Sequence, residues 1–394
     1  MTIEIPDPAR APATLAPFAL GFRPFFLAAG VLAVVLMGAW LLILQGSLGA
    51  GAWATPAWHG HEMLFGFTIA VIAGFLLTAV RNWTGLATPA GPPLAALFAV
   101  WLAGRLAWVL PNLPPLGVAL ADLAFLPVLA IVLARPILRA RQFANLAFPI
   151  LLLALAAANA LVHLEALALA HTARLGLHGA ASMVVMIMVI VGGRVIPSFT
   201  DNRLGSRARR WKPIEMALPW LTLLALLGWL AAPVSATTAL LAALAAVLHG
   251  SRLAGWYTGR VWNVPLLWVL HLGYAWLPLG FALLALAAAG VAPAHSSALH
   301  AFTAGGIGVL TLGMMARVSL GHTGRLLEAP PVMTWAFVAI NLAALLRVVP
   351  PLLMPAVMGP ALLASGLLWI AAFALFVFVY APMLLRPRVD GKPG

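Results

Sequence analysis

The stretch Trp58-His59-Gly60-His61-Glu62-Met63-Leu64-Phe65-Gly66 opens a run of residues that stays apolar until Arg81. An apolar run of this length predicts a helix that crosses a lipid bilayer. Two histidines and a carboxylate occupy its first two turns. Ionisable side chains inside a membrane are costly unless they bind a ligand, pair with each other or face water. The stretch therefore predicts a functional site, and we expect other spans to supply further members.

The composition is typical of a polytopic membrane protein. Of the 394 residues, 64% are hydrophobic and only 8% are charged, whereas soluble domains carry about 25% charged residues. We expect the net charge of +13 to reflect basic residues that orient the protein in the membrane and contact anionic lipid. We expect no nucleic-acid partner. The chain has no cysteine, which excludes disulfides, thiolate metal ligands and covalent c-type haem attachment. Histidine, carboxylate and methionine side chains remain as ligands.

The hydropathy pattern predicts an all-α membrane protein with twelve transmembrane helices, each from a run of roughly 20 apolar residues. The predicted spans are residues 22–44, 58–80, 92–110, 115–134, 145–169, 175–196, 214–231, 235–253, 263–289, 297–317, 332–349 and 357–384.

A weak internal repeat predicts how the spans are grouped. His61, His178 and His300 lie near the starts of spans 2, 6 and 10, and are separated by 117 and 122 residues. A threonine preceded by a ring-bearing residue follows each of them 22 or 23 positions later. The repeat predicts three four-helix units within one transmembrane domain, roughly 18–134, 145–253 and 263–384, about a pseudo-threefold axis.

Basic residues predict the orientation of the chain. They gather in the loops that follow even-numbered spans, for example at Arg135 and Arg139 and throughout 203–212, while the opposite loops carry almost none apart from Arg174. Loops rich in lysine and arginine remain in the cytoplasm. Both termini are therefore expected in the cytoplasm, and the Trp58–Gly66 stretch on the outer side.

The predicted topology places His59, His61, His163, His171, His178 and His300 at the outer side. Neutral imidazole binds copper, zinc and haem iron, so without thiolates a histidine-ligated haem is the expected redox cofactor, with a copper site as its companion. On a helix His59 and His61 point about 200° apart, so span 2 is expected to separate two sites. The alternative is that these rings bond lipid headgroups or backbone.

Three carboxylates lie on the same outer side. Glu62 shares a helix face with His59 and is the predicted catalytic proton carrier, or an acceptor that orients an imidazole ligand. Asp122 and Glu165 either extend a proton path or only satisfy buried donors.

The inner half holds a second group of candidates. His271 lies in the middle of an apolar span, where an imidazole has little water, and a functional role is favoured. His322 lies near the inner surface, where an ordinary structural role is favoured over a functional one. Arg194 and Arg317 stand near inner span ends, and either reach headgroups or hold an anionic group such as a haem propionate.

Five separated motifs resemble those of the NnrS family, and the resemblance covers about residues 15–385. The motifs are Gly21-Phe22-Arg23-Pro24-Phe25-Phe26, Trp58-His59-Gly60-His61-Glu62-Met63, Gly193-Arg194-Val195-Ile196-Pro197-Ser198-Phe199-Thr200, Trp268 to Tyr274, and Arg317-Val318-Ser319-Leu320-Gly321-His322-Thr323-Gly324-Arg325. The resemblance implies a bacterial inner-membrane protein of twelve spans that binds haem and copper and acts in the response to nitric oxide. It also implies that nine candidates stand at motif positions: His59, His61, Glu62, His178, His271, His300, His322, Arg194 and Arg317.

A looser architectural resemblance is to haem–copper oxidases and nitric oxide reductases, which carry histidine ligands on spans 2, 6 and 10. Here spans 6 and 10 carry single histidines at these positions, and span 7 has no His-His pair. A copy of their binuclear centre is therefore not expected.

The leading hypothesis is a membrane protein that binds nitric oxide and reduces it, an oxidoreductase with a non-covalent b-type haem and copper. Its metal ligands are drawn from His59, His61, His178 and His300, with His271, His322, Arg194 and Arg317 as further cofactor-binding residues. A periplasmic or quinol donor would deliver electrons. One alternative is a non-enzymatic nitric oxide sensor, sink or protector of iron pools, and another is a metal or haem transporter.

Because the chain has no cysteine, single introduced cysteines can report its orientation. In spheroplasts, a membrane-impermeant maleimide should label a Ser47→Cys variant, and should label a Ser206→Cys variant only after permeabilisation. Ser47 follows span 1 and Ser206 follows span 6, so the reverse labelling pattern would contradict the predicted orientation.

Overall fold

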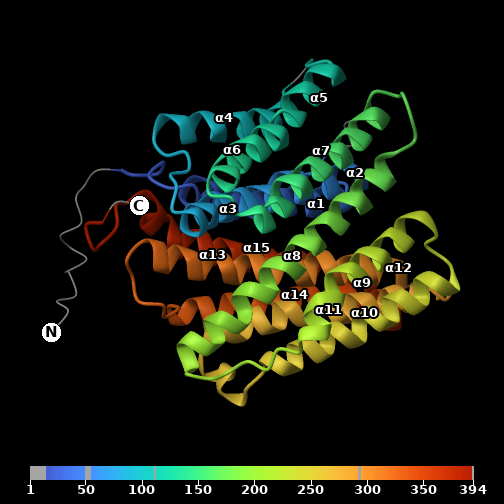
Figure 1. Ribbon diagram of the computed structural model, residues 1–394. Helices are drawn as coiled ribbons and strands as arrows, with labels where there is room; N and C mark the ends of the chain where they lie inside the picture. Colours follow the sequence, from blue (N-terminus) through green and yellow to red (C-terminus); the bar gives the residue numbers. More distant parts are fainter. Residues whose placement is uncertain (1–14, 49–54, 111, 292–293, 393–394) are drawn as a thin grey trace. The chain divides into compact units, whose positions relative to one another are not determined.

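The computed structural model describes residues 15–48, 55–110, 112–291 and 294–392, and the regular structure of these residues is entirely helical (Figure 1). The all-α prediction is confirmed. Within the described ranges, eleven helical segments are long and apolar enough to cross a membrane. The predicted third span is a shorter apolar helix, α4 (Pro92–Ala107), of 16 residues.

The eleven long segments correspond to the other eleven predicted spans. They are α1 (Phe22–Leu44); α2 (Pro56–His61) with the π-helix η2 (Glu62–Thr68) and α3 (Ile69–Thr84); α5 (Pro115–Leu123) with α6 (Phe125–Arg139); η3 (Phe143–Leu146) with α7 (Ala147–Ala166); α8 (Ala173–Leu204); α9 (Lys212–Ala231); α10 (Ala236–Trp256); α11 (Pro265–Ala288); α12 (Ala294–His300) with the π-helix η5 (Ala301–Ile307) and α13 (Gly308–His322); α14 (Pro331–Leu353); and η6 (Pro355–Val357) with α15 (Met358–Leu385).

Prolines explain several helix boundaries. Proline begins α2, α4, α5, α11 and α14, because its fixed φ suits the first helical position, where no N–H is needed. Between α5 and α6, Pro127 has no N–H to donate to the carbonyl of Leu123, which accounts for the break there. By contrast, Pro197 lies inside α8, which continues to Leu204 although the predicted span ends at residue 196.

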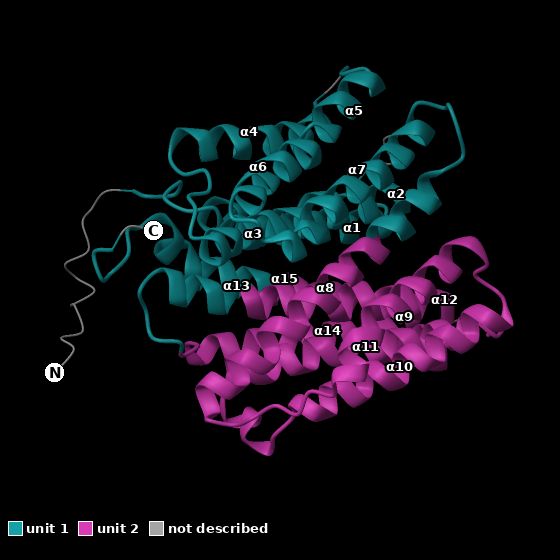
Figure 2. Cartoon of the chain, in the orientation of Figure 1, with its two compact units in different colours: residues 1–180, 315–327, 373–394 teal, residues 181–314, 328–372 magenta. Residues whose placement is uncertain are grey.

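The chain forms two compact units (Figure 2). Unit 1 comprises residues 1–180, 315–327 and 373–394, and unit 2 comprises residues 181–314 and 328–372. Helices α8, α13 and α15 each pass from one unit into the other. The three four-helix units predicted from the repeat remain a prediction.

Two π-helices of seven residues, η2 and η5, directly follow His61 and His300. In η2, the hydroxyl of Thr68 donates to the carbonyl of Met63, five residues earlier, at 2.7 Å. π-Helices are rare and occur often at functional sites. Their matching positions support a structural relation between spans 2 and 10, whereas His178, the third histidine of the repeat, lies in α8.

The motif at Gly21–Phe26 packs the core of unit 1. Phe22, Phe25 and Phe26 are fully buried, and α1 packs along α3. Arg23 is also fully buried, and its Nη1 donates to the carbonyls of Met383 and Leu384 at 3.3 and 3.0 Å. Since these carbonyls lie at the end of α15, Arg23 caps that helix.

Helices α4 and α5 approach closely at Gly104, where an added Cβ would lie 2.9 Å from the Cα of Asp122. A Gly104→Ala variant should therefore lower the thermal unfolding temperature of the purified protein, since overpacking typically costs about 1–3 kcal/mol. Gly38→Ala is the matched control, because Gly38 lies in α1 with no atom within 4 Å of an added Cβ. Equal unfolding temperatures for the two variants would contradict this packing.

Candidate metal centre

His61 lies at the end of α2 with its ring fully buried among acceptor oxygens. Its Nδ1 is 3.0 Å from Glu62 Oε1. Its Nε2 is 3.0 Å from Asp122 Oδ2 and 2.9 Å from Asn159 Oδ1. A neutral imidazole has one N–H and one lone pair, so one of its nitrogens would face oxygen without a proton between them. The geometry therefore calls for a cation, either a second proton or a metal ion.

Asp122 of α5 contacts side chains from three other helices. Its Oδ2 accepts from Asn159 Nδ2 at 2.8 Å and lies 2.8 Å from Nε2 of His163, both on α7. Its Oδ1 forms an ion pair with Arg105 of α4. The carboxylate is thus surrounded by groups from α2, α4 and α7, and it holds these helices of unit 1 together.

Arg105 balances only part of the buried negative charge. Its Nη1 donates to Glu62 Oε1 at 2.7 Å, in addition to its ion pair with Asp122. One guanidinium against two carboxylates leaves a formal charge of −1 when both histidines are neutral. All six side chains of the cluster are at most 7% exposed. An uncompensated buried charge is strongly unfavourable, so the cluster requires one further positive charge.

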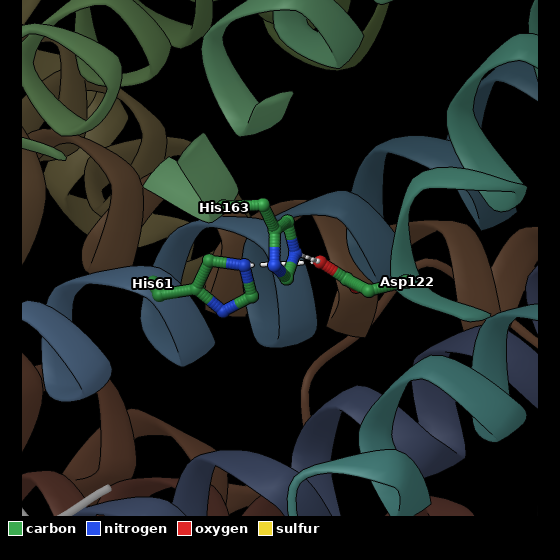
Figure 3. Close-up of side chains that lie close together, drawn as sticks. All are labelled: His61, Asp122 and His163. Atoms are coloured by element: carbon green, nitrogen blue, oxygen red, sulfur yellow. Dashed lines mark hydrogen bonds and ion pairs between the residues drawn. The ribbon is translucent and has the colours of Figure 1, made fainter. Parts of the chain in front are cut away.

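A metal ion fits this requirement. Nitrogen atoms of His61 and His163 and an oxygen of Asp122 lie within 4.8 Å of one another, and both rings turn toward the carboxylate (Figure 3). Two imidazoles with one carboxylate are a donor set for iron, and imidazole also suits copper and zinc. A haem iron at His61 would first require its Nε2 to be released from Asp122 and Asn159. The centre is therefore suited to a compact ion.

Aromatic rings and a glycine shape the surroundings. Trp108 stacks on His163, with ring centroids 5.7 Å apart, and Phe65 lies against His61 at 5.0 Å. At Gly66, a Cβ would lie 3.0 Å from Glu62 Oε2 and 3.2 Å from Arg105 Nη1. The glycine in η2 therefore leaves the space in which Glu62 and Arg105 meet.

The rings of His59 and His61 contact different helices, and the two sites predicted on either side of span 2 remain a prediction. His59 stacks on Trp40 of α1, with ring centroids 4.5 Å apart and planes at 13°, whereas His61 contacts α5 and α7. His178 lies in the second turn of α8 within unit 1, and its Nδ1 is 2.9 Å from the carbonyl of Arg174. His300 belongs to unit 2, and its Nδ1 is 2.8 Å from the carbonyl of Ser296. Their roles as metal ligands remain predictions.

The inner candidates differ in burial. His271 is buried in α11, with Nδ1 3.0 Å from the carbonyl of Leu267. His322 is half-buried and packs against Phe22, with centroids 5.7 Å apart. Arg317 is buried and Arg194 is exposed. The cofactor roles predicted for these four residues also remain predictions.

Sequence reasoning missed two members of the cluster. Asp122 and His163 could be placed on the outer side, but Arg105 and Asn159 were not recognised as candidates. Both are polar residues in apolar spans, Arg105 in span 3 and Asn159 in span 5, and the charge pattern predicts that both lie in the outer half. That shared depth is the signal that points to them.

Removal of the arginine should destabilise the protein. An Arg105→Met variant leaves two carboxylates without their buried partner, a change that typically costs about 3–5 kcal/mol. Arg203→Met is the control, because the Arg203–Glu328 pair is exposed and such pairs contribute about 0–1 kcal/mol. Thermal unfolding in detergent measures both, and adding Glu62→Gln to Arg105→Met should recover part of the loss. Equal unfolding temperatures for the two single variants would show that the cluster is not held by charge.

Comparison with known proteins gives one family. No curated protein matches the chain. The model of the NnrS protein family matches residues 16–388, which is nearly the whole chain and includes the five motifs and every residue of the cluster. The protein therefore belongs to the NnrS family.

Proposed function

We propose that this protein is a metal-dependent membrane protein that binds nitric oxide, with its metal ion held by His61, Asp122 and His163. Membership of the NnrS family suggests a nitric-oxide-related membrane protein. The observation that carries the proposal is the buried cluster, in which a histidine–aspartate–histidine donor set coincides with a formal charge of −1. A metal cation held by these residues would supply the missing charge and a site for nitric oxide.

The proposal divides the cofactors that the family resemblance implies. Copper is assigned to the buried cluster. There His61 is joined by Asp122 and His163 instead of the predicted ligands His59, His178 and His300. A non-covalent b-type haem is assigned to the remaining predicted ligands, either His59 or His178 in unit 1 or His300 in unit 2. When bound, these groups would supply the redox chemistry that reduction of nitric oxide requires. The protein is proposed to lie in a bacterial inner membrane with both termini in the cytoplasm.

Glu62 is the proposed proton carrier. Reduction of two nitric oxide molecules to nitrous oxide and water consumes two electrons and two protons, so a buried centre needs a group that delivers protons. Glu62 Oε1 contacts Nδ1 of His61 at 3.0 Å and Arg105 Nη1 at 2.7 Å. It therefore touches the ligand ring on the side away from Asp122, where it can hand a proton to that ring.

A second candidate is a non-enzymatic nitric oxide sink or sensor. The complete burial of His61 and the closed ring of hydrogen bonds around it favour a site that only a diatomic gas enters. A turnover assay distinguishes the enzyme from the sink or sensor. Repeated release of nitrous oxide from nitric oxide and a reductant supports the enzyme, and binding without turnover supports the sink or sensor.

Metal analysis of the purified protein tests the proposal. Wild type should contain about one equivalent of metal at the cluster, and Asp122→Asn and His163→Gln should each weaken metal binding by about 10-fold or more. His171→Gln is the control, since His171 is an exposed histidine on the same predicted side. A wild type without metal, or an Asp122→Asn variant that keeps its full content, would refute the assignment.

A further inference from the structure

Residues 386–392, which follow α15, fold back on the loop after α13 within unit 1. The amide of Val389 donates to the carbonyl of Thr323 at 3.1 Å. Gly324 has a positive φ of 79°, and an added Cβ there would lie 2.8 Å from Cγ of Asp390. A glycine is therefore needed where the two segments cross. The last of the five sequence motifs, which ends at Arg325, thus contributes to a defined structure.

Four arginines gather at this crossing, and we call them the arginine cluster: Arg23, Arg325, Arg386 and Arg388. Arg23 donates to the carbonyl of Arg386, and the charges of Arg325 and Arg388 both act on Arg23. Arg325 in turn interacts with the charge of Arg386. Asp390 accepts from Nε and Nη2 of Arg388 at 2.8 and 2.6 Å. Four arginines and this one aspartate carry a formal charge of +3.

Part of this positive charge is removed from water. Arg23 is fully buried, and the end of α15 that it caps offers only about half a negative charge. Nη1 of Arg325 is buried and has no hydrogen-bond partner among the described residues. Burial, and then the charge of Arg386, lower the pKa of Arg325. An unpaired buried donor and an excess of buried charge are both costly, and a bound anion would relieve both.

The surroundings of the cluster favour a lipid over a soluble anion. Guanidinium groups match the oxygens of a phosphate group. Leu326, next to Arg325, is 66% exposed, and Leu15 is 72% exposed. The amide of Ala16 donates to the carbonyl of Leu385 at 2.8 Å, which places Leu15 at the same end of α15. Phosphate donors beside exposed apolar side chains suit a ligand that has a phosphate and an acyl chain.

We propose that the arginine cluster is a specific site for the phosphate headgroup of an anionic phospholipid. Arg325 and the exposed Arg386 contact the phosphate, while Arg23 and Arg388 hold the segment that carries Arg386. The charge pattern predicts that these helix ends lie on the cytoplasmic side, at the level of the headgroups. Exposed basic loops attract anionic lipid only as diffuse charge, whereas this cluster combines buried charge with an unpaired donor. The proposal is independent of the metal centre and of nitric oxide.

Native mass spectrometry of the full-length protein, delipidated in detergent, tests the site by counting bound lipids. Wild type should retain one phosphatidylglycerol at a concentration at which phosphatidylcholine does not bind. The double variant Arg325→Gln with Arg386→Gln should bind phosphatidylglycerol about 10-fold more weakly or worse, because it loses two of the charges. Arg386→Gln alone, at an exposed position, should weaken binding about 5-fold, and it keeps the test valid if the double variant does not fold.

Arg207→Gln with Arg210→Gln is the matched control, since both arginines are exposed and lie in a basic loop on the same predicted side. This control makes the same change in net charge and should bind phosphatidylglycerol like wild type. Equal weakening in the control, equal retention of phosphatidylcholine, or displacement of the lipid by inorganic phosphate at equal concentration would each overturn the proposal. So would a haem absorption band that the Arg325→Gln, Arg386→Gln variant removes. Metal content should be unchanged in that variant, so failure of this proposal is recognised separately from failure of the metal centre.

Discussion

The structure of unit 1 depends on the burial of two carboxylates inside a membrane-spanning bundle. Asp122 and Glu62 are almost completely removed from solvent, and such groups persist in a membrane only when they are paired. Arg105 pairs with both, and His61 lies between them. The surrounding features serve this arrangement: Gly104 lets α4 approach Asp122, and Gly66 leaves space for the contact between Glu62 and Arg105. The remaining formal charge of −1 links this architecture to metal binding.

The sequence alone was sufficient to predict the helices and to identify the His59–Glu62 stretch as part of a functional site. Long apolar runs predict spans whatever their partners are, and the His59–Glu62 stretch stands out because ionisable groups are rare there. The partners of His61 were harder to predict. Charge in the loops gives the depth of a residue but not the direction in which its helix is turned. Asp122 and His163 therefore had the right depth without a known neighbour, while the repeat favoured His178 and His300. The contacts of Arg105 and Asn159 depend on packing between helices far apart in sequence.

The two π-helices show what the spans 2 and 10 share and where they differ. Each begins directly after a histidine and lasts for seven residues. In η2 the first residue is Glu62, whereas the first residue of η5 is Ala301. The same backbone feature thus carries a carboxylate in unit 1 and a methyl group in unit 2. The buried carboxylate that follows His61 therefore has no counterpart directly after His300.

X-ray absorption at the metal edge of the purified wild-type protein tests the central claim most directly. If His61, Asp122 and His163 hold the ion, the spectrum will show nitrogen and oxygen neighbours at about 2.0–2.2 Å, with the multiple scattering of two imidazole rings. A spectrum that contains only porphyrin-bound iron, or no bound metal, would contradict the account and leave the cluster as a closed network of ion pairs.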